Sequence, residues 1–217
     1  MLLSPSFNAE LLRGMVLEAK GLWEEAAALY DRILAATPAH EGAHKRKVAA
    51  LRGQGKLEAA ATALTTYLAT WQADLEGWAE LAELNIALGQ HRQAAFCIEE
   101  LLLAVPSASM WHTWYASVLA TIGDADALRT AQKHYAAAIE LSEGDDVRAL
   151  FGAVAVAAAL AKSGASSSVV VDGEDGDSVA DLPGLAAERL VQLYTQKAPG
   201  QLVPLVKAAL QALRPSK

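Results

Sequence analysis

Apolar residues recur along most of the chain at intervals of three and four positions, the spacing that places them on one face of a helix. Residues 75–108 show the pattern best: two apolar stripes are separated at Gly89 and followed by Pro106. Glycine without a Cβ can take the left-handed conformation that ends a helix, and proline cannot continue one. The stretch therefore predicts two helices joined by a tight turn.

This unit recurs with a fixed period. The residues that keep intervals of 34 positions are Gly21, Gly55, Gly89 and Gly123 at the turns, and Ala26, Ala60 and Ala94 in the second helices. Ala82 and Ala94 are small where two helices cross closely, and a larger residue would overpack that crossing by about 1–3 kcal/mol. Helix–turn–helix units of about 34 residues are typical of tetratricopeptide repeats, which bury their apolar faces by stacking. We predict an all-α fold, a tetratricopeptide-repeat solenoid of about five helix pairs with a C-terminal capping helix pair.

The predicted solenoid covers residues 1–162, with repeats at about 7–40, 41–74, 75–108 and 109–144 and the first helix of a fifth at 145–162. After Gly123 the register slips by three residues, so Ala131 rather than Leu128 takes the small position. We therefore expect a longer turn at residues 124–127. Residues 163–184, rich in Ser, Gly and acid, predict a flexible loop. Residues 185–217 predict the capping helices that a solenoid needs over its terminal apolar face.

Composition excludes several classes of protein. The net charge is −7, but residues 163–184 contain five acidic and no basic residues, and without them it is −2. No basic footprint of a nucleic-acid binder is present. Cys97 is the only cysteine, so an intrachain disulfide is impossible and a reducing compartment is expected. The longest apolar run, residues 149–161, is shorter than the roughly 18 residues that span a membrane. The N-terminus lacks the pattern of a signal peptide.

No arrangement of residues predicts catalysis, a cofactor or a metal site. His40 and His44 have helical i, i+4 spacing but straddle two repeats, and they provide too few ligands for zinc. Cys97 lies beside a packing position and predicts a buried, inert thiol. The acidic run DGEDGD at 172–177 lacks the glycine and glutamate of a calcium loop. We expect a protein without enzymatic activity; the competing hypothesis is an enzyme whose site the sequence does not reveal.

A binding groove is the remaining candidate site. The first helix of each tetratricopeptide repeat lines the concave face, and the residues predicted to line it here are Lys45, Arg52, Glu76, Glu83, Ile86, Met110 and Thr113. Alternatively, the basic and acidic residues pair with one another across adjacent repeats, which is worth about 0–1 kcal/mol at a surface. A clamp for a peptide carboxylate is disfavoured, because Ala49, Ala79 and Glu76 stand where further cationic or amide partners are needed.

Several segments are more specific than a generic repeat. They resemble subunit 2 of the endoplasmic reticulum membrane protein complex, and they are HKRKVAALRGQGK (44–56), DLEGWAELAELNI (74–86), QAAFCIEELLLAVP (93–106), AQKHYAAAIEL (131–141) and VRALFGAV (147–154). Members of that family carry further helices ahead of this first repeat, whereas this sequence starts almost inside it, so no partner surface is predicted for those helices.

The resemblance implies a non-catalytic scaffold subunit, peripheral on the cytoplasmic face of the endoplasmic reticulum membrane. It would hold cytosolic segments of the membrane-embedded subunits and dock a second soluble subunit, and the assembly would insert tail-anchored and multi-pass proteins. Contact with the membrane would be indirect, through these partners, and no nucleic acid is implied. The alternative is a free cytosolic peptide-binding adaptor or co-chaperone, which would need a self-sufficient groove.

Overall fold

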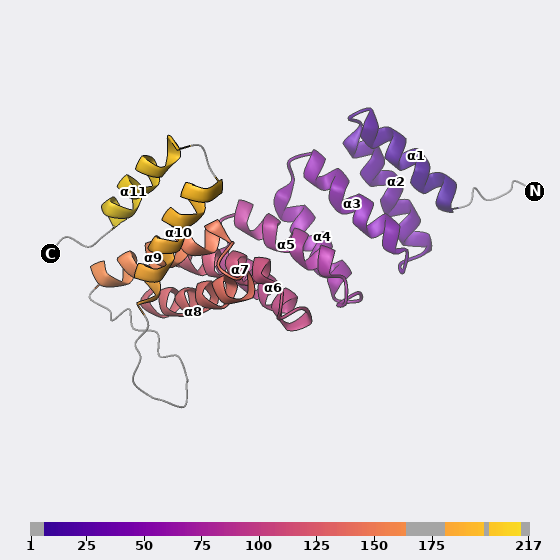
Figure 1. Cartoon of the computed structure of the whole chain (residues 1–217). Coiled ribbons are helices and arrows are strands. Elements are labelled where there is room, and N and C mark those ends of the chain that lie inside the picture. The colour runs from indigo at the N-terminus through magenta and orange to yellow at the C-terminus, as the bar shows by residue number, and fades with distance from the viewer. Residues whose placement is uncertain (1–6, 164–180, 198–199, 214–217) are drawn as a thin grey trace, which may run out of the picture. The chain divides into compact units, whose positions relative to one another are not determined.

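The computed structural model describes residues 7–163, 181–197 and 200–213. Every regular element within these residues is an α-helix (Figure 1). Their bounds are α1 Phe7–Ala19, α2 Trp23–Ala36, α3 Glu41–Gly53, α4 Leu57–Leu68, α5 Leu75–Ala87, α6 His91–Ala104, α7 Ser109–Ile122, α8 Ala125–Leu141, α9 Val147–Lys162, α10 Leu182–Lys197 and α11 Leu202–Leu213. The predicted all-α fold is confirmed. Most of the predicted flexible loop, residues 164–180, lies outside the described residues.

The helices form two compact units, Met1–Cys97 and Ile98–Lys217, and the division falls inside α6. In the first unit each of the helices α1 to α4 packs against the next one in the chain, and α1 also contacts α3. In the second unit α7, α8, α9 and α10 follow the same rule, α7 also contacts α9, and α11 lies against α10 and α9. Packing on both the next helix and the one after it is how repeats share one apolar core.

The turns confirm the glycine periodicity. The glycines that end the first helices have positive φ angles, which are 75° at Gly21, 73° at Gly55, 71° at Gly89 and 78° at Gly123. A residue with a Cβ is strained in this left-handed conformation. The predicted left-handed turn at Gly89 is therefore confirmed.

Side-chain caps fix the starts of four helices. The N-cap residues that accept a backbone N–H are His40, Asp74, Asp124 and Asp146. Such caps satisfy amide groups that have no partner within the first turn, and each is worth about 1 kcal/mol. Asp181 also accepts the N–H of Gly184 at 3.1 Å, so α10 begins at Leu182, inside the range predicted as loop.

The expected longer turn after Gly123 is wrong. Only Gly123 and Asp124 separate α7 from α8, and the N–H of Ala127 donates to Asp124 Oδ1 at 2.8 Å. The three additional residues instead lengthen α8, which has 17 residues. Ala and Leu favour a helix here, and the Asp124 cap starts it at once. The small residue expected at the crossing, Ala131, is fully buried.

The small residues occupy the closest helix crossings. The alanines that are fully buried at these positions are Ala26, Ala60, Ala82 and Ala94. Glycines allow an even closer approach: a Cβ at Gly14 would overlap the ring of Tyr30, one at Gly53 the ring of Trp23, and one at Gly152 the ring of Tyr135. The core therefore combines close helix crossings at small residues with large buried side chains such as Tyr30, Tyr67 and Leu64.

Candidate functional site

Lys45, the first basic residue of the predicted groove, is bound to its own and the following repeat. Its Nζ lies 2.7 Å from Asp74 Oδ2 and 3.4 Å from Glu41 Oε1. Tyr67 donates a hydrogen bond of 2.7 Å to the same oxygen of Asp74. Burial alone would raise the pKa of the Asp74 carboxyl, but the hydrogen bonds from Lys45, Tyr67 and Gly77 lower it below its usual value. Asp74 thus joins α3, α4 and α5 as a carboxylate.

Arg52 pairs with acidic residues of α5. Its Nη1 lies 2.6 Å from Glu80 Oε1, and its Nη2 lies 3.7 Å from Glu83 Oε2. The alternative interpretation, in which groove charges pair across adjacent repeats, therefore holds for Arg52 and Glu83. Lys45 forms its ion pair with Asp74 and not with Glu76. Among the described residues Glu76 has no ion-pair partner and is exposed.

The other predicted groove residues differ in accessibility. Ile86 is half-buried in the first unit, and Met110 is exposed in the second. Thr113 is buried, and its hydroxyl donates to Asp146 Oδ2 at 2.7 Å, which links α7 to the N-cap of α9. The structure brings Lys45, Arg52 and Glu83 together through α3 and α5. A single groove that also includes Met110 and Thr113 stays a prediction, because these two belong to the other unit.

A buried charged network lies beside this surface and escaped the sequence analysis. Glu18 is only 7% exposed, accepts a hydrogen bond of 2.5 Å from the Tyr30 hydroxyl and pairs with the Arg46 guanidinium. These residues come from α1, α2 and α3. Burial, and then the hydrogen bond to Glu18, raise the pKa of the Tyr30 hydroxyl. The sequence did not signal this network, because a glutamate on a helix is usually exposed.

A second polar cluster joins α7 and α8. Nε2 of His112 lies 2.9 Å from the carbonyl oxygen of Pro106, which can only accept, so His112 Nδ1 is the acceptor for His134 Nδ1 at 3.0 Å. The ring of Tyr115 packs edge-on against His134, and its hydroxyl donates to Glu99. Burial, and then the neighbouring His112, lower the pKa of His134. The 22 residues between the histidines hid this contact from the sequence analysis.

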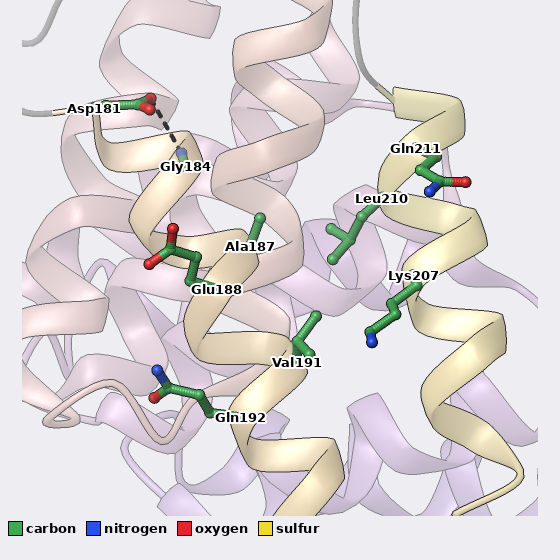
Figure 2. A pocket seen from close by; sticks show the side chains of 9 residues that line it. All are labelled: Asp181, Gly184, Ala187, Glu188, Val191, Gln192, Lys207, Leu210 and Gln211. Carbon is green, nitrogen blue, oxygen red and sulfur yellow. Dashed lines mark hydrogen bonds between the residues drawn. The ribbon is translucent and has the colours of Figure 1, made fainter.

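A cavity of about 570 Å³ lies between α10 and α11 (Figure 2). Ala187 and Val191 of α10 and Leu210 of α11 provide its apolar lining, and Glu188 and Lys207 stand on opposite sides. A neighbouring cavity of about 340 Å³ shares Ala187 and Leu210 and extends along the alanines of α9. The small side chains of α9 and α10 leave this space beneath α11.

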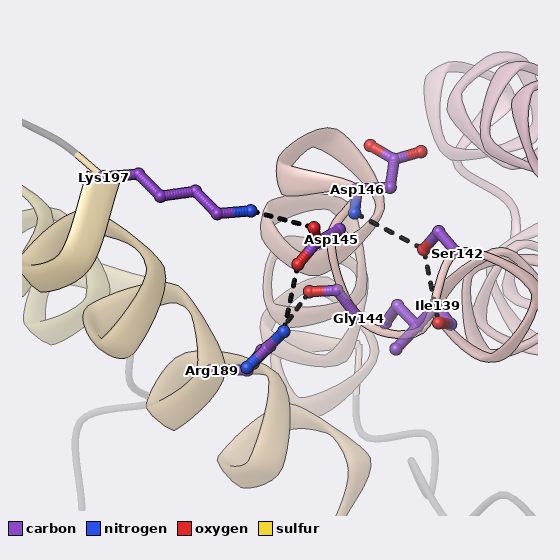
Figure 3. Close-up of polar contacts among 7 residues, drawn as sticks. All are labelled: Ile139, Ser142, Gly144, Asp145, Asp146, Arg189 and Lys197. Carbon is purple, nitrogen blue, oxygen red and sulfur yellow. Dashed lines mark hydrogen bonds and ion pairs between the residues drawn. The ribbon is translucent and has the colours of Figure 1, made fainter.

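α10 is tied to the turn between α8 and α9 (Figure 3). Arg189 Nε donates to the carbonyl oxygen of Gly144 at 3.1 Å, and Arg189 Nη2 lies 3.0 Å from Asp145. Lys197 Nζ lies 2.8 Å from the same carboxylate. The hydrogen bond from Lys197 is the main cause that lowers the pKa of Asp145. This arrangement positions α10 and gives the turn a structural role.

The described residues contain no group of three or more His, Cys, Asp or Glu side chains that could hold a metal ion. Cys97 is buried beside Asn85, whose Nδ2 lies 3.6 Å from its sulfur, as expected for a packing thiol. None of the helices in the described part of the chain combines the length and apolar character needed to cross a membrane.

Comparison with known proteins identifies the family of this chain. Residues 1–136 match the sequence model of the EMC2 TPR-like repeat domain. ER membrane protein complex subunit 2-A of Xenopus laevis is 37% identical over 147 residues, 68% of this chain and 49% of that protein. ER membrane protein complex subunit 2 of Dictyostelium discoideum is 30% identical over 137 residues, 63% of this chain and 42% of that protein. The chain spans about half the length of the curated relatives it matches.

Solved structures share the fold. A tetratricopeptide repeat protein from Parabacteroides merdae superimposes with a TM-score of 0.67 at 16% identity, over 96% of this chain and 73% of that chain. At this identity the likeness shows the fold alone. The tetratricopeptide-repeat fold predicted from the 34-residue period is therefore confirmed.

Proposed function

Because the chain belongs to the family of EMC2 TPR-like repeat domains, we propose that it is a non-catalytic scaffold subunit of the endoplasmic reticulum membrane protein complex. The observation that carries this proposal is the family match over residues 1–136, together with relatives named as subunit 2 of that complex at 30–37% identity. Repeat proteins of this kind act through extended surfaces for partners rather than through a reactive centre.

The chemistry of the surface supports a role in holding cytosolic segments of membrane subunits. Cytosolic segments next to membrane helices carry an excess of Lys and Arg. On α5, Glu76 is exposed without an ion-pair partner among the described residues, and Glu83 is only loosely paired with Arg52 at 3.7 Å. Both carboxylates are available to basic segments. In the first unit Ile86 adds apolar contact area, and Lys45 and Arg52 form ion pairs beside it. In the second unit Met110 provides apolar contact area of its own, and Thr113 links α7 to the N-cap of α9.

In this role the chain lies on the cytoplasmic face, peripheral to the membrane and bound through its partners. It docks the membrane-embedded subunits and a second soluble subunit, and it thereby supports insertion of tail-anchored and multi-pass proteins. A protease added to sealed microsomes should degrade the chain. Protection from the protease in sealed but not in opened vesicles would contradict the cytoplasmic placement.

Affinity purification of the tagged chain from gently solubilised membranes tests the proposal. Mass spectrometry should recover a set of multi-pass and soluble subunits in fixed ratio. The double variant Glu76→Lys/Glu83→Lys should lose membrane subunits, while the matched reversal Glu24→Lys/Glu58→Lys, at exposed positions on α2 and α4, should retain them. Recovery of soluble chaperones alone, or of no partner, would reject the complex; equal recovery with both variants would reject the role of α5.

Insertion is tested separately in cells depleted of the protein. Re-expression of the chain should restore insertion of a tail-anchored reporter, measured by glycosylation of a site at the lumenal end. The variant Ala94→Trp should fail to restore it, because Ala94 is fully buried and tryptophan overpacks the crossing. Full restoration by a chain that recovers no subunits would separate the insertion activity from the complex.

A further inference from the structure

Exposed apolar side chains are concentrated on α1 and the turn that follows it. Of the twelve large apolar residues that are exposed among the described residues, five lie between positions 7 and 22, and they are Phe7, Leu12, Met15, Val16 and Leu22. Leu12 is 61% and Val16 is 53% exposed, and they stand one turn apart on the same face of the helix. Contiguous exposed apolar side chains of this kind mark interaction sites.

The surface is hollowed beside these residues. A cavity of about 520 Å³ is lined by Leu12, Val16 and Leu17 of α1 and by Leu29 of α2. Arg13 of α1 and Arg32 of α2 also line it. We call this region the α1–α2 trough. Its lining joins an apolar surface to two guanidinium groups, one from each helix.

The arginines of the α1–α2 trough differ from the basic residues of α3 in their ion pairs. The basic residues of α3 that form ion pairs with neighbouring helices are Lys45, Arg46, Lys47 and Arg52. By contrast, neither Arg13 nor Arg32 has an ion-pair partner in the part of the chain that the structure describes. Glu10 is the single acidic residue in the lining. The trough therefore offers two guanidinium groups that have no ion-pair partner among the described residues. Guanidinium groups bind carboxylates through paired N–H donors.

The backbone selects the form of the occupant. α1 and α2 use their amide and carbonyl groups in their own helices, so the trough has no open edge to which a strand could add. Two packed helices instead present ridges and grooves that accept a third helix. From these contacts we propose that the α1–α2 trough docks an amphipathic helix of a protein partner. Its apolar stripe covers Leu12 and Val16, and acidic residues at the edges of the stripe pair with Arg13 and Arg32.

This inference does not depend on membership of the complex, because it follows from the lining of the trough alone. It is tested with the full chain, expressed at its natural level in cells, with a photoreactive amino acid in place of Val16. The same substitution at Thr62, exposed on α4 and outside the trough, gives the background. Peptide mapping should locate the adduct from position 16 in one helical partner segment with Asp or Glu beside its apolar stripe.

Charge reversal identifies the contact. The variant Arg13→Glu/Arg32→Glu should lower the yield of this adduct by about tenfold or more. Lys20→Glu, an exposed change on the same hairpin outside the trough, should leave the yield unchanged. Reversing the acidic residues of the partner segment to Lys should restore the adduct in the double variant. Circular dichroism should show unchanged thermal midpoints for all variants, because these side chains are exposed.

Four outcomes would overturn the proposal. The first is an adduct yield at position 16 no higher than that at Thr62. The second is a main adduct with a second copy of this chain or with lipid. The third is an adduct with a segment that is extended or basic. The fourth is an adduct whose yield does not change in Arg13→Glu/Arg32→Glu while this variant remains folded.

Discussion

The two units contain the same glycine–tyrosine contact in different polar surroundings. In the first unit Gly14 of α1 lies against the ring of Tyr30, and in the second Gly152 of α9 lies against the ring of Tyr135. The Tyr30 hydroxyl donates to Glu18, which also binds Arg46. The Tyr135 hydroxyl has no hydrogen-bond partner among the described residues. Burial, and then the charge of Asp146, raise its pKa to about 12.

The comparison separates steric fit from polar linkage. Close approach of two helices requires only that the glycine lacks a Cβ, since the Gly152 contact forms without a hydrogen bond to the ring hydroxyl. The network around Glu18 also links three successive helices through hydrogen bonds, because its members lie on α1, α2 and α3. Buried polar networks of this kind specify one arrangement when every member is satisfied. The first unit should therefore depend on a few polar groups to a degree that the second does not.

The largest effect is expected when the shared contact is broken. Gly14→Leu and Gly152→Leu should each lower the free energy of unfolding by about 3 kcal/mol, the upper end for overpacking, because a Cβ already overlaps the tyrosine ring. Urea unfolding followed by circular dichroism measures the loss. Adding Tyr30→Ala or Tyr135→Ala to the respective glycine variant should recover part of it. If either variant unfolded at the urea concentration of the original protein, the close approach would be incorrect.

Removing a carboxylate that accepts a tyrosine hydroxyl, buried at Glu18 and exposed at Glu99, should distinguish the units next. Glu18→Ala should cost about 2–3 kcal/mol, less than for a fully buried pair because the Arg46 side chain is 35% exposed. Glu99→Ala, which removes the acceptor of the Tyr115 hydroxyl, should cost about 1 kcal/mol. The same urea unfolding measures both. Equal losses at the two positions would show that the network around Glu18 contributes no more than a single hydrogen bond.

Removal of a single hydroxyl gives the sharpest form of the comparison. Tyr30→Phe should destabilise the protein by about 1–2 kcal/mol, because Glu18 loses a hydrogen bond. Tyr135→Phe should change stability by less than about 0.5 kcal/mol, since its hydroxyl serves no described partner. Thermal unfolding of the two variants beside the original chain measures the difference. A larger loss for Tyr135→Phe would reverse the ranking.

Acid should weaken the second unit through His134. The folded pKa of His134 is lowered from its ordinary value of 6.5, so below pH 6.5 the unfolded chain takes up a proton before the folded chain does. The free energy of unfolding should therefore be fully retained above pH 6.5 and fall as the pH decreases below it. The charge of Glu99 opposes this shift of the His134 pKa. His134→Gln should reduce the dependence between pH 7 and 5; an unchanged slope would exclude His134 as its source.

The surface ion pairs of the predicted groove should have the smallest effect. Arg52→Ala should lower stability by about 0–0.5 kcal/mol, because Arg52 and Glu83 are both exposed and water screens their interaction. Repeating the urea unfolding in 1 M salt should remove most of this difference. A loss of several kcal/mol that persists in salt would mean that Arg52 supports the core.

The features that depend on local chemistry were predictable from the sequence. The 34-residue period identified the helix pairs, the left-handed Gly89 and the buried Ala94, because turn geometry and close crossing each restrict one position to small residues. The turn after Gly123 was predicted wrongly because a capping aspartate can start a helix wherever helix-forming residues follow, and the added residues then extend α8. The register slip showed that three residues are added but not whether they lie in the turn or in the helix.

The polar contacts were not predictable, because they depend on how side chains are directed between packed helices. Glu18 and Arg46 are 28 residues apart, and His112 and His134 are 22 apart. The structure buries Glu18 against Arg46, and the sequence gives no sign of this burial. The pairing of Arg52 with Glu83 was one of two alternatives. The role of the other groove residues in partner binding remains a prediction.

The most direct test of the scaffold role is the size distribution of the endogenous chain after gentle solubilisation of membranes. Size-exclusion chromatography followed by quantitative mass spectrometry should find nearly all of it in one large species, at constant ratio to multi-pass subunits of the endoplasmic reticulum membrane protein complex. Elution of most of the chain at the position of the isolated protein, with those subunits in other fractions, would contradict the proposal that it is a scaffold of that complex.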